Sequence, residues 1–358
     1  VWLFVAKGRK FNKAIYYSIV IASLSICFVV AFVEQWLNVS STANDVQLMG
    51  KKLFSGKKVV YIYHDTVDNA GEHNENAIFT KLKGLDKEAA GRTSGEGFYY
   101  LLGDIAQLHE AMIAYARDYM ISKGFTYAIP PFMIHSNVVT GVMSFPEMEA
   151  MMYKIENEDL YLIGTSEHSM IGKFKGELLK ESDLPITMTS YSPCFRKEIG
   201  SHGIEERGLY RLHQFEKQEM VVLCKPEEGM EWYNKMWKLS VELFRNLNIP
   251  VRQLECCSGD LADLKVKSCD VEAWSPRQGK YFEVCSCSNL GDAQARRLKI
   301  RVKGENGNYL PHTLNNTVVA PPRMLIAFLE NNYNEDGSIN IPEALRPYMG
   351  GQEKIVKK

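Results

Sequence analysis

The chain has 358 residues, of which 46% are hydrophobic, so it can bury a large core and is not an intrinsically disordered protein. Its formal net charge of −1 excludes a global attraction to nucleic acid or to an anionic membrane, so any such site must be a local patch. None of the eight cysteines has the C-x2-C spacing of a structural zinc site, which favours reduced thiols in a cytosol-like compartment.

An uncharged segment lies near the amino end. Residues 14–33, AIYYSIVIASLSICFVVAFV, are long enough, at about 1.5 Å per residue, to cross the hydrocarbon core of a bilayer. They predict a transmembrane helix and a membrane contact; the alternative is a buried core helix, which usually carries a polar stripe. The basic residues before this run would keep the amino end in the cytoplasm. We therefore expect residues 1–38 to be a basic flank followed by a hydrophobic helix.

A polar linker follows, and residues 59–63 form an apolar and aromatic run that predicts one strand. We assign residues 39–83 to this linker with its short strand and loop. Residues 1–83 contain no sustained heptad repeat with charged flanks, so the sequence predicts no coiled coil there.

Residues 84–358 have the pattern of one globular domain. Asp104 and Gln107 predict a capping box before a helix that ends near Gly124. The apolar face of this helix should contain Ile105, Leu108, Met112, Ile113, Ala116 and Met120. A second helix is predicted after Pro226 and before Pro250, with Met230, Trp237, Val241 and Phe244 on its apolar face.

Strands outnumber helices in this domain. A strand near residue 127 is interrupted at Pro130 and Pro131. Further strands are predicted over residues 159–164, 186–195, 212–224, 269–276 and 281–289. Because turns join most of them, the expected fold class is α+β, a mainly antiparallel sheet flanked by helices.

Two clusters of charge lie within residues 190–220. In an extended strand, Arg196 and Glu198 project from one face, and Phe215, Lys217 and Glu219 share a face of the returning strand. An aromatic ring beside an arginine and two carboxylates can stack on a base, bind a phosphate and accept hydrogen bonds from an amine. The alternative is a hairpin that carries only structural salt bridges.

Several long segments resemble one family. SPCFRKEIGSHG and RGLYRLHQFEKQEM, within residues 192–220, are similar to motif 2 of the class II aminoacyl-tRNA synthetases in the form typical of seryl-tRNA synthetases. YFEVCSCSNLGDAQARRLKIR and HTLNNTVVAPPRMLIAFLEN resemble the approach to motif 3 and motif 3 itself. YLIGTSEHSM resembles the serine-binding segment, and GFTYAIPPFMI resembles motif 1. The similarity extends over residues 84–351.

The resemblance implies a class II synthetase catalytic domain over residues 84–358 that forms seryl-adenylate from ATP and serine and transfers the seryl group to tRNA. It implies ATP and Mg²⁺ as cofactors and L-serine and tRNA(Ser) as partners. It further implies a cytoplasmic location and a homodimer formed through the motif 1 region around Pro131.

Site residues carry over by motif position. The implied catalytic residues are Arg196, Glu283 and Arg323. The implied ATP-binding residues are Arg196, Lys197, Glu198, Leu212, Phe215, Glu283, Val284, Cys285, Ser286 and Arg323. Serine would contact Thr165, Ser166, Glu167, Glu219 and Thr317, and the metal would bind to Glu283 and Ser286.

The chain departs from the family pattern in residues 1–83, where the family carries a tRNA-binding coiled-coil arm. We therefore expect transfer to tRNA to be impaired relative to activation. The alternative function is that of an atypical, membrane-tethered synthetase-like protein with a binding role or a non-tRNA acceptor.

Overall fold

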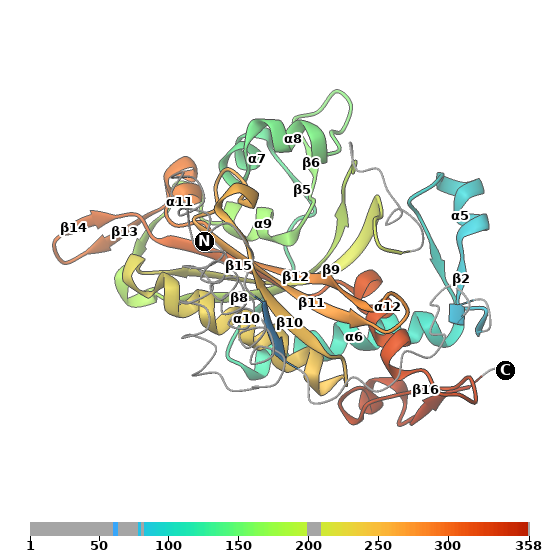
Figure 1. Ribbon diagram of the computed structural model, residues 1–358. Helices are drawn as coiled ribbons and strands as arrows, with labels where there is room; N and C mark the ends of the chain where they lie inside the picture. The colour runs from blue at the N-terminus through green and yellow to red at the C-terminus, as the bar shows by residue number, and fades with distance from the viewer. Residues whose placement is uncertain (1–59, 64–77, 80–81, 199–208, 357–358) are drawn as a thin grey trace, which may run out of the picture. The chain divides into compact units, whose positions relative to one another are not determined.

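The computed structural model describes residues 60–63, 78–79, 82–198 and 209–356 (Figure 1). The chain divides into two units, Val1–Tyr63 and His64–Lys358. The described part of the first unit is strand β1, Val60–Tyr63, where the sequence predicts a strand. The hydrophobic helix predicted over residues 14–33 and most of the predicted linker lie outside the described residues. Within the described ranges, no helix combines the length and apolarity needed to cross a membrane.

A twisted, mainly antiparallel sheet forms the centre of the second unit. Its strands follow the order β10-β11-β12-β15-β9-β8-β4. Only the edge pair β4–β8 is parallel among these neighbours. The strand bounds are Thr126–Ala128 for β4, Ile186–Phe195 for β8, Gln214–Cys224 for β9, Val251–Glu255 for β10, Lys267–Ser275 for β11, Lys280–Asn289 for β12 and His312–Val319 for β15.

Helices cover both faces of this sheet. Figure 1 shows α6 and α10 on one side and α7, α8 and α9 on the other. The helix bounds are Lys87–Ser94 for α5, Gly103–Ser122 for α6, Ser136–Val142 for α7, Phe145–Met151 for α8, Ser166–Gly172 for α9, Gly229–Asn246 for α10, Ala293–Leu298 for α11 and Pro321–Asn332 for α12.

Short strands make the smaller sheets at the periphery. These strands are β2 (Leu85–Asp86) with β3 (Tyr100–Leu101), β5 (Met133–Ile134) with β6 (Tyr161–Leu162), β7 (Leu178–Lys180) with β13 (Arg301–Gly304) and β14 (Gly307–Tyr309), and β16 (Ile339–Asn340) with β17 (Lys354–Ile355). The 3-10 turns are η1 (Glu181–Asp183), η3 (Pro226–Glu228), η4 (Ser258–Asp260) and η5 (Glu343–Met349).

The predicted α+β class and the antiparallel sheet are confirmed, but two local predictions are wrong. Helix α6 begins at Gly103, so Asp104 lies in its first turn and makes no cap. The capping box belongs to α8, where Ser144 and Glu147 form it. In α10, Met230 is exposed rather than part of the apolar face. The predicted core face of α6 is buried as expected.

The end of α12 is fastened to the turn between β11 and β12. Glu330 is fully buried, and its carboxylate accepts hydrogen bonds from Ser275 Oγ at 2.5 Å and Arg277 Nε at 2.9 Å. Asn331 Nδ2 donates to the carbonyl of Trp274 at 2.9 Å. A buried carboxylate needs such partners, because an unpaired one would be strongly destabilising.

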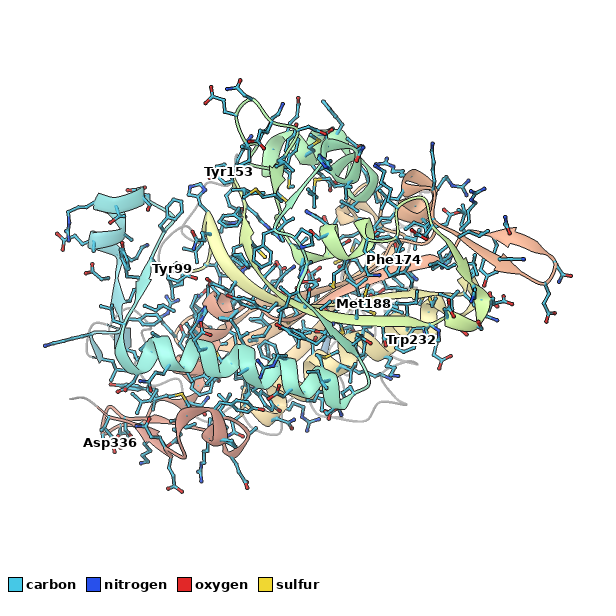
Figure 2. All side chains as sticks on the ribbon, turned by 180° about the vertical axis from the view of Figure 1, so that it is seen from behind. Tyr99, Tyr153, Phe174, Met188, Trp232 and Asp336 are labelled. Atoms are coloured by element: carbon cyan, nitrogen blue, oxygen red, sulfur yellow. The ribbon has the colours of Figure 1, made fainter. Side chains whose placement is uncertain are left out.

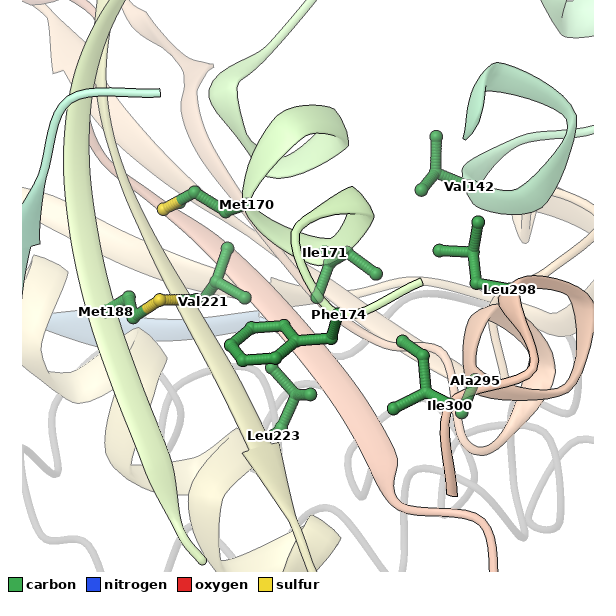
Figure 3. Close-up of a cluster of buried hydrophobic side chains, with 10 residues drawn as sticks. All are labelled: Val142, Met170, Ile171, Phe174, Met188, Val221, Leu223, Ala295, Leu298 and Ile300. Carbon is green, nitrogen blue, oxygen red and sulfur yellow. The ribbon is translucent and has the colours of Figure 1, made fainter. Parts of the chain in front are cut away.

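A buried apolar cluster holds α9 and α11 against the sheet (Figure 3). It joins Val142 of α7, residues of α9 and of strands β8 and β9, and Leu298 of α11. Phe174, directly after α9, is 6% exposed and projects into the cluster. In the reverse view, Phe174 and Met188 lie near each other (Figure 2), in agreement with their membership of this cluster. The cluster therefore fixes the start of α9, which borders the cavity described below.

We expect Phe174→Ala to lower the free energy of unfolding by about 3–5 kcal/mol, because it removes a buried ring and leaves a cavity. Phe145→Ala is the matched control, since Phe145 is 60% exposed and its loss should have a small effect. Urea denaturation followed by tryptophan fluorescence measures both changes. Equal effects of the two substitutions would contradict the assigned packing.

Candidate active site

One cavity of about 340 Å³ opens between the central sheet, α9 and the start of α12. Strands β8 and β9, with Arg196, Glu198 and residues 209–212, supply one wall, and β12 and β15 supply another. Of the residues implied by the family resemblance, those that line it are Thr165, Glu167, Arg196, Glu198, Leu212, Phe215, Glu219, Glu283, Val284, Cys285, Ser286, Thr317 and Arg323.

Two implied residues do not line the cavity. The side chain of Lys197 reaches the carbonyl of Glu149, with Nζ at 3.5 Å. Ser166 is fully buried as the first residue of α9. Motif position placed both in the site, but Lys197 contacts Glu149 instead and Ser166 is not among the lining residues.

Arg196 lies at the end of β8, over the ring of Phe215. The guanidinium carbon is 5.3 Å from the ring centroid, and Nε donates to the carbonyl of Gly164 at 3.1 Å. Glu198 follows with a positive φ of 49°, and its carboxylate is 3.2 Å from Arg211 Nη1. A cation, an aromatic ring and a carboxylate therefore line the cavity together, although Arg196 and Glu198 lie beyond the end of β8 and not in the extended strand that the alternation predicted.

Arg323 occupies the opposite wall, in the first turn of α12. Its Nη1 lies 3.1 Å from Glu283 Oε2, and its guanidinium carbon lies 4.4 Å from the centroid of the Tyr210 ring. Nε also donates to the Tyr210 carbonyl at 3.3 Å. The prolines Pro321 and Pro322 open this helix and carry no backbone N–H, so its start favours anions through the positive end of the helix dipole and through Arg323.

Buried carboxylates gather at the inner end of the cavity. Glu219 is 1% exposed and is paired with Lys217 of the same strand. Thr317 is the register partner of Glu219 on β15, so their side chains enter the cavity together. Thr165 Oγ1 is buried and has no hydrogen-bond partner among the described residues. Such a set can bind a small molecule that carries both an ammonium group and a hydroxyl.

Glu167 is the second carboxylate at this end. Burial raises the pKa of Glu167 and the nearby charge of Glu219 raises it further, whereas Gln294, Lys217 and Lys265 oppose the rise. Burial also lowers the pKa of His168 to about 3, with Arg196 and Lys217 adding to the effect. The His168 imidazole is therefore neutral at physiological pH.

The sequence reasoning missed several residues that line the cavity. Strand alternation places Lys217 on the face of Phe215 and Glu219, and it lines the cavity with them, but the family resemblance gave it no role in the site. Tyr210, Arg211 and His168 adjoin the recognised motifs, but their orientation depends on tertiary packing. Lys265 comes from the loop before β11 and carries no local signal.

Glu283 and Ser286 provide oxygen ligands of the kind that Mg²⁺ prefers. Asp270, the register partner of Ser286, lies beside them, and burial together with the charge of Glu283 raises the pKa of Asp270 to about 6. Within the described ranges, no group of three or more His, Cys, Asp or Glu side chains is arranged to hold a metal. The residues fit Mg²⁺ nonetheless, because this ion is often held by one or two carboxylates together with substrate phosphates.

Comparisons with known proteins agree with this geometry. The family model of the tRNA synthetase class II core domain (G, H, P, S and T) matches residues 151–332. The serine–tRNA ligase of Thermococcus sibiricus is 45% identical over 279 residues, which are 77% of this chain and 61% of the relative. The chain thus spans about three fifths of the length of that curated relative.

Two solved structures are also similar. Seryl-tRNA synthetase from Pyrococcus horikoshii, complexed with ATP, superposes with a TM-score of 0.79 at 40% identity, covering 87% of this chain and 69% of that one. The cytoplasmic serine–tRNA ligase from Naegleria fowleri, in complex with AMP, gives a TM-score of 0.77 at 34% identity, covering 85% and 65%. From the family model and these relatives, we conclude that the chain belongs to the seryl-tRNA synthetase family of class II tRNA synthetases.

Proposed function

We propose that the chain uses ATP to activate L-serine as seryl-adenylate and transfers the seryl group to tRNA(Ser). The observation that carries this proposal is that Arg196, Phe215 and Arg323 line one cavity with the buried Glu219 and Thr317. The cavity thus joins groups suited to a nucleotide with groups suited to a small hydroxylated amino acid. The relatives' names and the ATP complex of the Pyrococcus horikoshii protein support the assignment.

In the proposed activation step, the serine carboxylate attacks the α-phosphorus of ATP, a new O–P bond forms and pyrophosphate leaves. Phe215 would stack on the adenine and Glu198 would accept from its amine. Arg196 would bind the α-phosphate and Arg323 the terminal phosphates, offsetting charge that moves onto pyrophosphate. No protein nucleophile is required, so the rate depends on positioning and charge.

Glu283 and Ser286 would hold Mg²⁺, whose charge offsets that of the phosphates when it is bound. Arg323 would exchange its Glu283 partner for phosphate oxygens as ATP binds. Glu198 would likewise leave Arg211 for the adenine amine. Both Glu198 and Arg323 are already paired with another charged residue of the cavity, so nucleotide binding would replace existing partners.

At the inner end, Glu219 and Glu167 would accept from the serine ammonium, and Thr317 would bind near the hydroxyl. The seryl group would then pass from the adenylate to the terminal ribose of tRNA, with AMP as the leaving group. A binding role without catalysis is not favoured, because it would not need Arg196, Glu198, Glu283 and Arg323 together in one cavity.

We expect Arg323→Ala to reduce serine-dependent ATP–pyrophosphate exchange by about 10²–10³-fold, because the variant loses an electrostatic contact to the leaving phosphates. Arg346→Ala is the matched control, since Arg346 pairs with Glu353 at 2.9 Å and does not line the cavity. The isotope-exchange assay on the full chain measures both. Unchanged exchange in Arg323→Ala would refute the assigned role.

We expect Thr317→Val to reduce the preference for serine over alanine by about tenfold or more, because a hydroxyl partner is removed while the volume is kept. Thr317→Ser should retain the preference. The ratio of kcat/KM for the two amino acids in the exchange assay measures it. An equal loss toward both amino acids, with a raised KM for ATP, would place Thr317 elsewhere.

We also propose that two copies associate through the motif 1 region. Ile129, Pro131 and Met133 alternate along one exposed stretch, with Ile129 76% and Met133 48% exposed. Such a row of apolar side chains is suited to burial against a second copy.

We expect Ile129→Lys to shift the sedimentation coefficient from that of a dimer toward that of a monomer, because it places a charge in the proposed interface. Analytical ultracentrifugation measures the change. A monomeric parent chain would contradict the proposal.

A further inference from the structure

Gln294 is a fully buried amide between α11 and the inner end of the cavity. Its Nε2 donates to Glu167 Oε1 at 2.8 Å and to the carbonyl of Val142 at 3.2 Å. Its Oε1 accepts from Thr313 Oγ1 at 2.7 Å. Both N–H groups and the carbonyl oxygen of the Gln294 side chain therefore have hydrogen-bond partners.

These partners allow one orientation of the amide. A flipped amide would turn its carbonyl oxygen toward two acceptors, the Glu167 carboxylate and the Val142 carbonyl. The Thr313 hydroxyl, which now donates to the Gln294 carbonyl oxygen, would then face an N–H group and would have to accept instead. Gln294 is thus held with its N–H groups toward Glu167 by contacts from β15 and α7.

The backbone around Gln294 is also fixed. Ala295 and Leu298, on the same short helix, belong to the apolar cluster of Figure 3, together with Val142 and residues after α9. The amide therefore projects from a packed helix toward a carboxylate that borders the cavity. A carboxylate so deeply buried needs a donor of this kind to remain ionised.

We propose that Gln294 is a positioning residue for amino-acid binding: it orients the Glu167 carboxylate toward the substrate ammonium and favours its ionised form, and Thr313 holds the amide in place. This inference deepens the proposed function and rests on it for the identity of the amino acid. Gln294 itself does not line the cavity, so it acts through Glu167.

The alternative is that Gln294 has a structural role only and stabilises the packing of α11 against its neighbours. Asn332 offers a matched control for that role, because it is 4% exposed and donates to the carbonyls of Leu247 at 3.3 Å and Phe328 at 3.1 Å, away from the cavity. Asn332→Leu removes a buried amide with comparable structural consequences. It should leave the KM values for serine and ATP unchanged.

We expect Gln294→Leu to raise the KM for serine by about 10–100-fold in the exchange assay, with the KM for ATP changed less than about twofold. Thr313→Val should raise the KM for serine by about 3–10-fold, and Thr313→Ser should restore it, because the serine hydroxyl can again donate to Gln294. The Thr313 pair remains informative if Gln294→Leu does not fold. Equal changes in both KM values, or no rescue by Thr313→Ser, would overturn the proposal.

The pH dependence of kcat/KM for serine distinguishes a positioning role of Gln294 from a purely structural role. The charges that act on Glu167 are Glu219, Lys217 and Lys265, while His168 beside it is neutral. Since the hydrogen bond from Gln294 lowers the pKa of Glu167, its loss raises that pKa. The acid limb of kcat/KM for serine should therefore move to higher pH in Gln294→Leu, whereas a structural defect would lower activity at every pH.

A direct titration keeps this test independent of the substrate. NMR of the full chain labelled with ¹³C at glutamate Cδ, with the Glu167 signal assigned through Glu167→Gln, should show a higher pKa for Glu167 in Gln294→Leu than in the parent. If the parent catalyses no serine-dependent exchange but this shift appears, the proposed function fails and the positioning role stands. If exchange occurs and the titration of Glu167 is unchanged, the positioning role fails.

Discussion

The antiparallel register between β8 and β9 decides which side chains can reach the cavity. Cys194 lies opposite Phe215 and Ser190 opposite Glu219, so the second strand turns Phe215, Lys217 and Glu219 inward. On its other edge, β9 pairs with β15 so that Glu219 faces Thr317, just before a register shift. A slip of one residue along either ladder would send these side chains to the opposite face, where Glu216 binds Tyr99 and His109. The geometry of the cavity is therefore a property of the sheet.

Charge within the cavity is balanced. Its walls carry as many basic as acidic side chains: Arg196, Arg211, Lys217, Lys265 and Arg323 against Glu147, Glu167, Glu198, Glu219 and Glu283. Several of these are paired across the site, which lowers the penalty for burying them before substrate arrives. The proposed ligands, a nucleotide and an amino acid, would bring complementary charges of both signs. Each can replace an internal partner, so the cavity need not hold a large uncompensated charge in either state.

The sequence predicts the residues that alternate on strands better than those placed by loops and distant contacts. Phe215 and Glu219 both line the cavity because alternate residues of a strand point to the same face of the sheet. The ten-residue strand β8 has the predicted bounds. Lys197 and Ser166 were placed by motif position alone, and neither is among the residues that line the cavity. The cap assigned to Asp104 failed because a glycine with positive φ begins the helix one residue earlier. Gln294 lies 127 residues from Glu167 in the chain, so no local pattern could reveal their contact.

Helix α12 is held at both ends by polar contacts of different kinds. Its first turn presents Arg323 to the cavity, while Glu330 and Asn331 near its last turn are bonded to the β11–β12 turn. Those far contacts join the helix to the same pair of strands that carries Glu283. These contacts therefore couple the position of the helix to that of the strand that carries Glu283. Rotation of the Arg323 side chain, a fast and local motion, would let it exchange Glu283 for phosphate without displacing the helix.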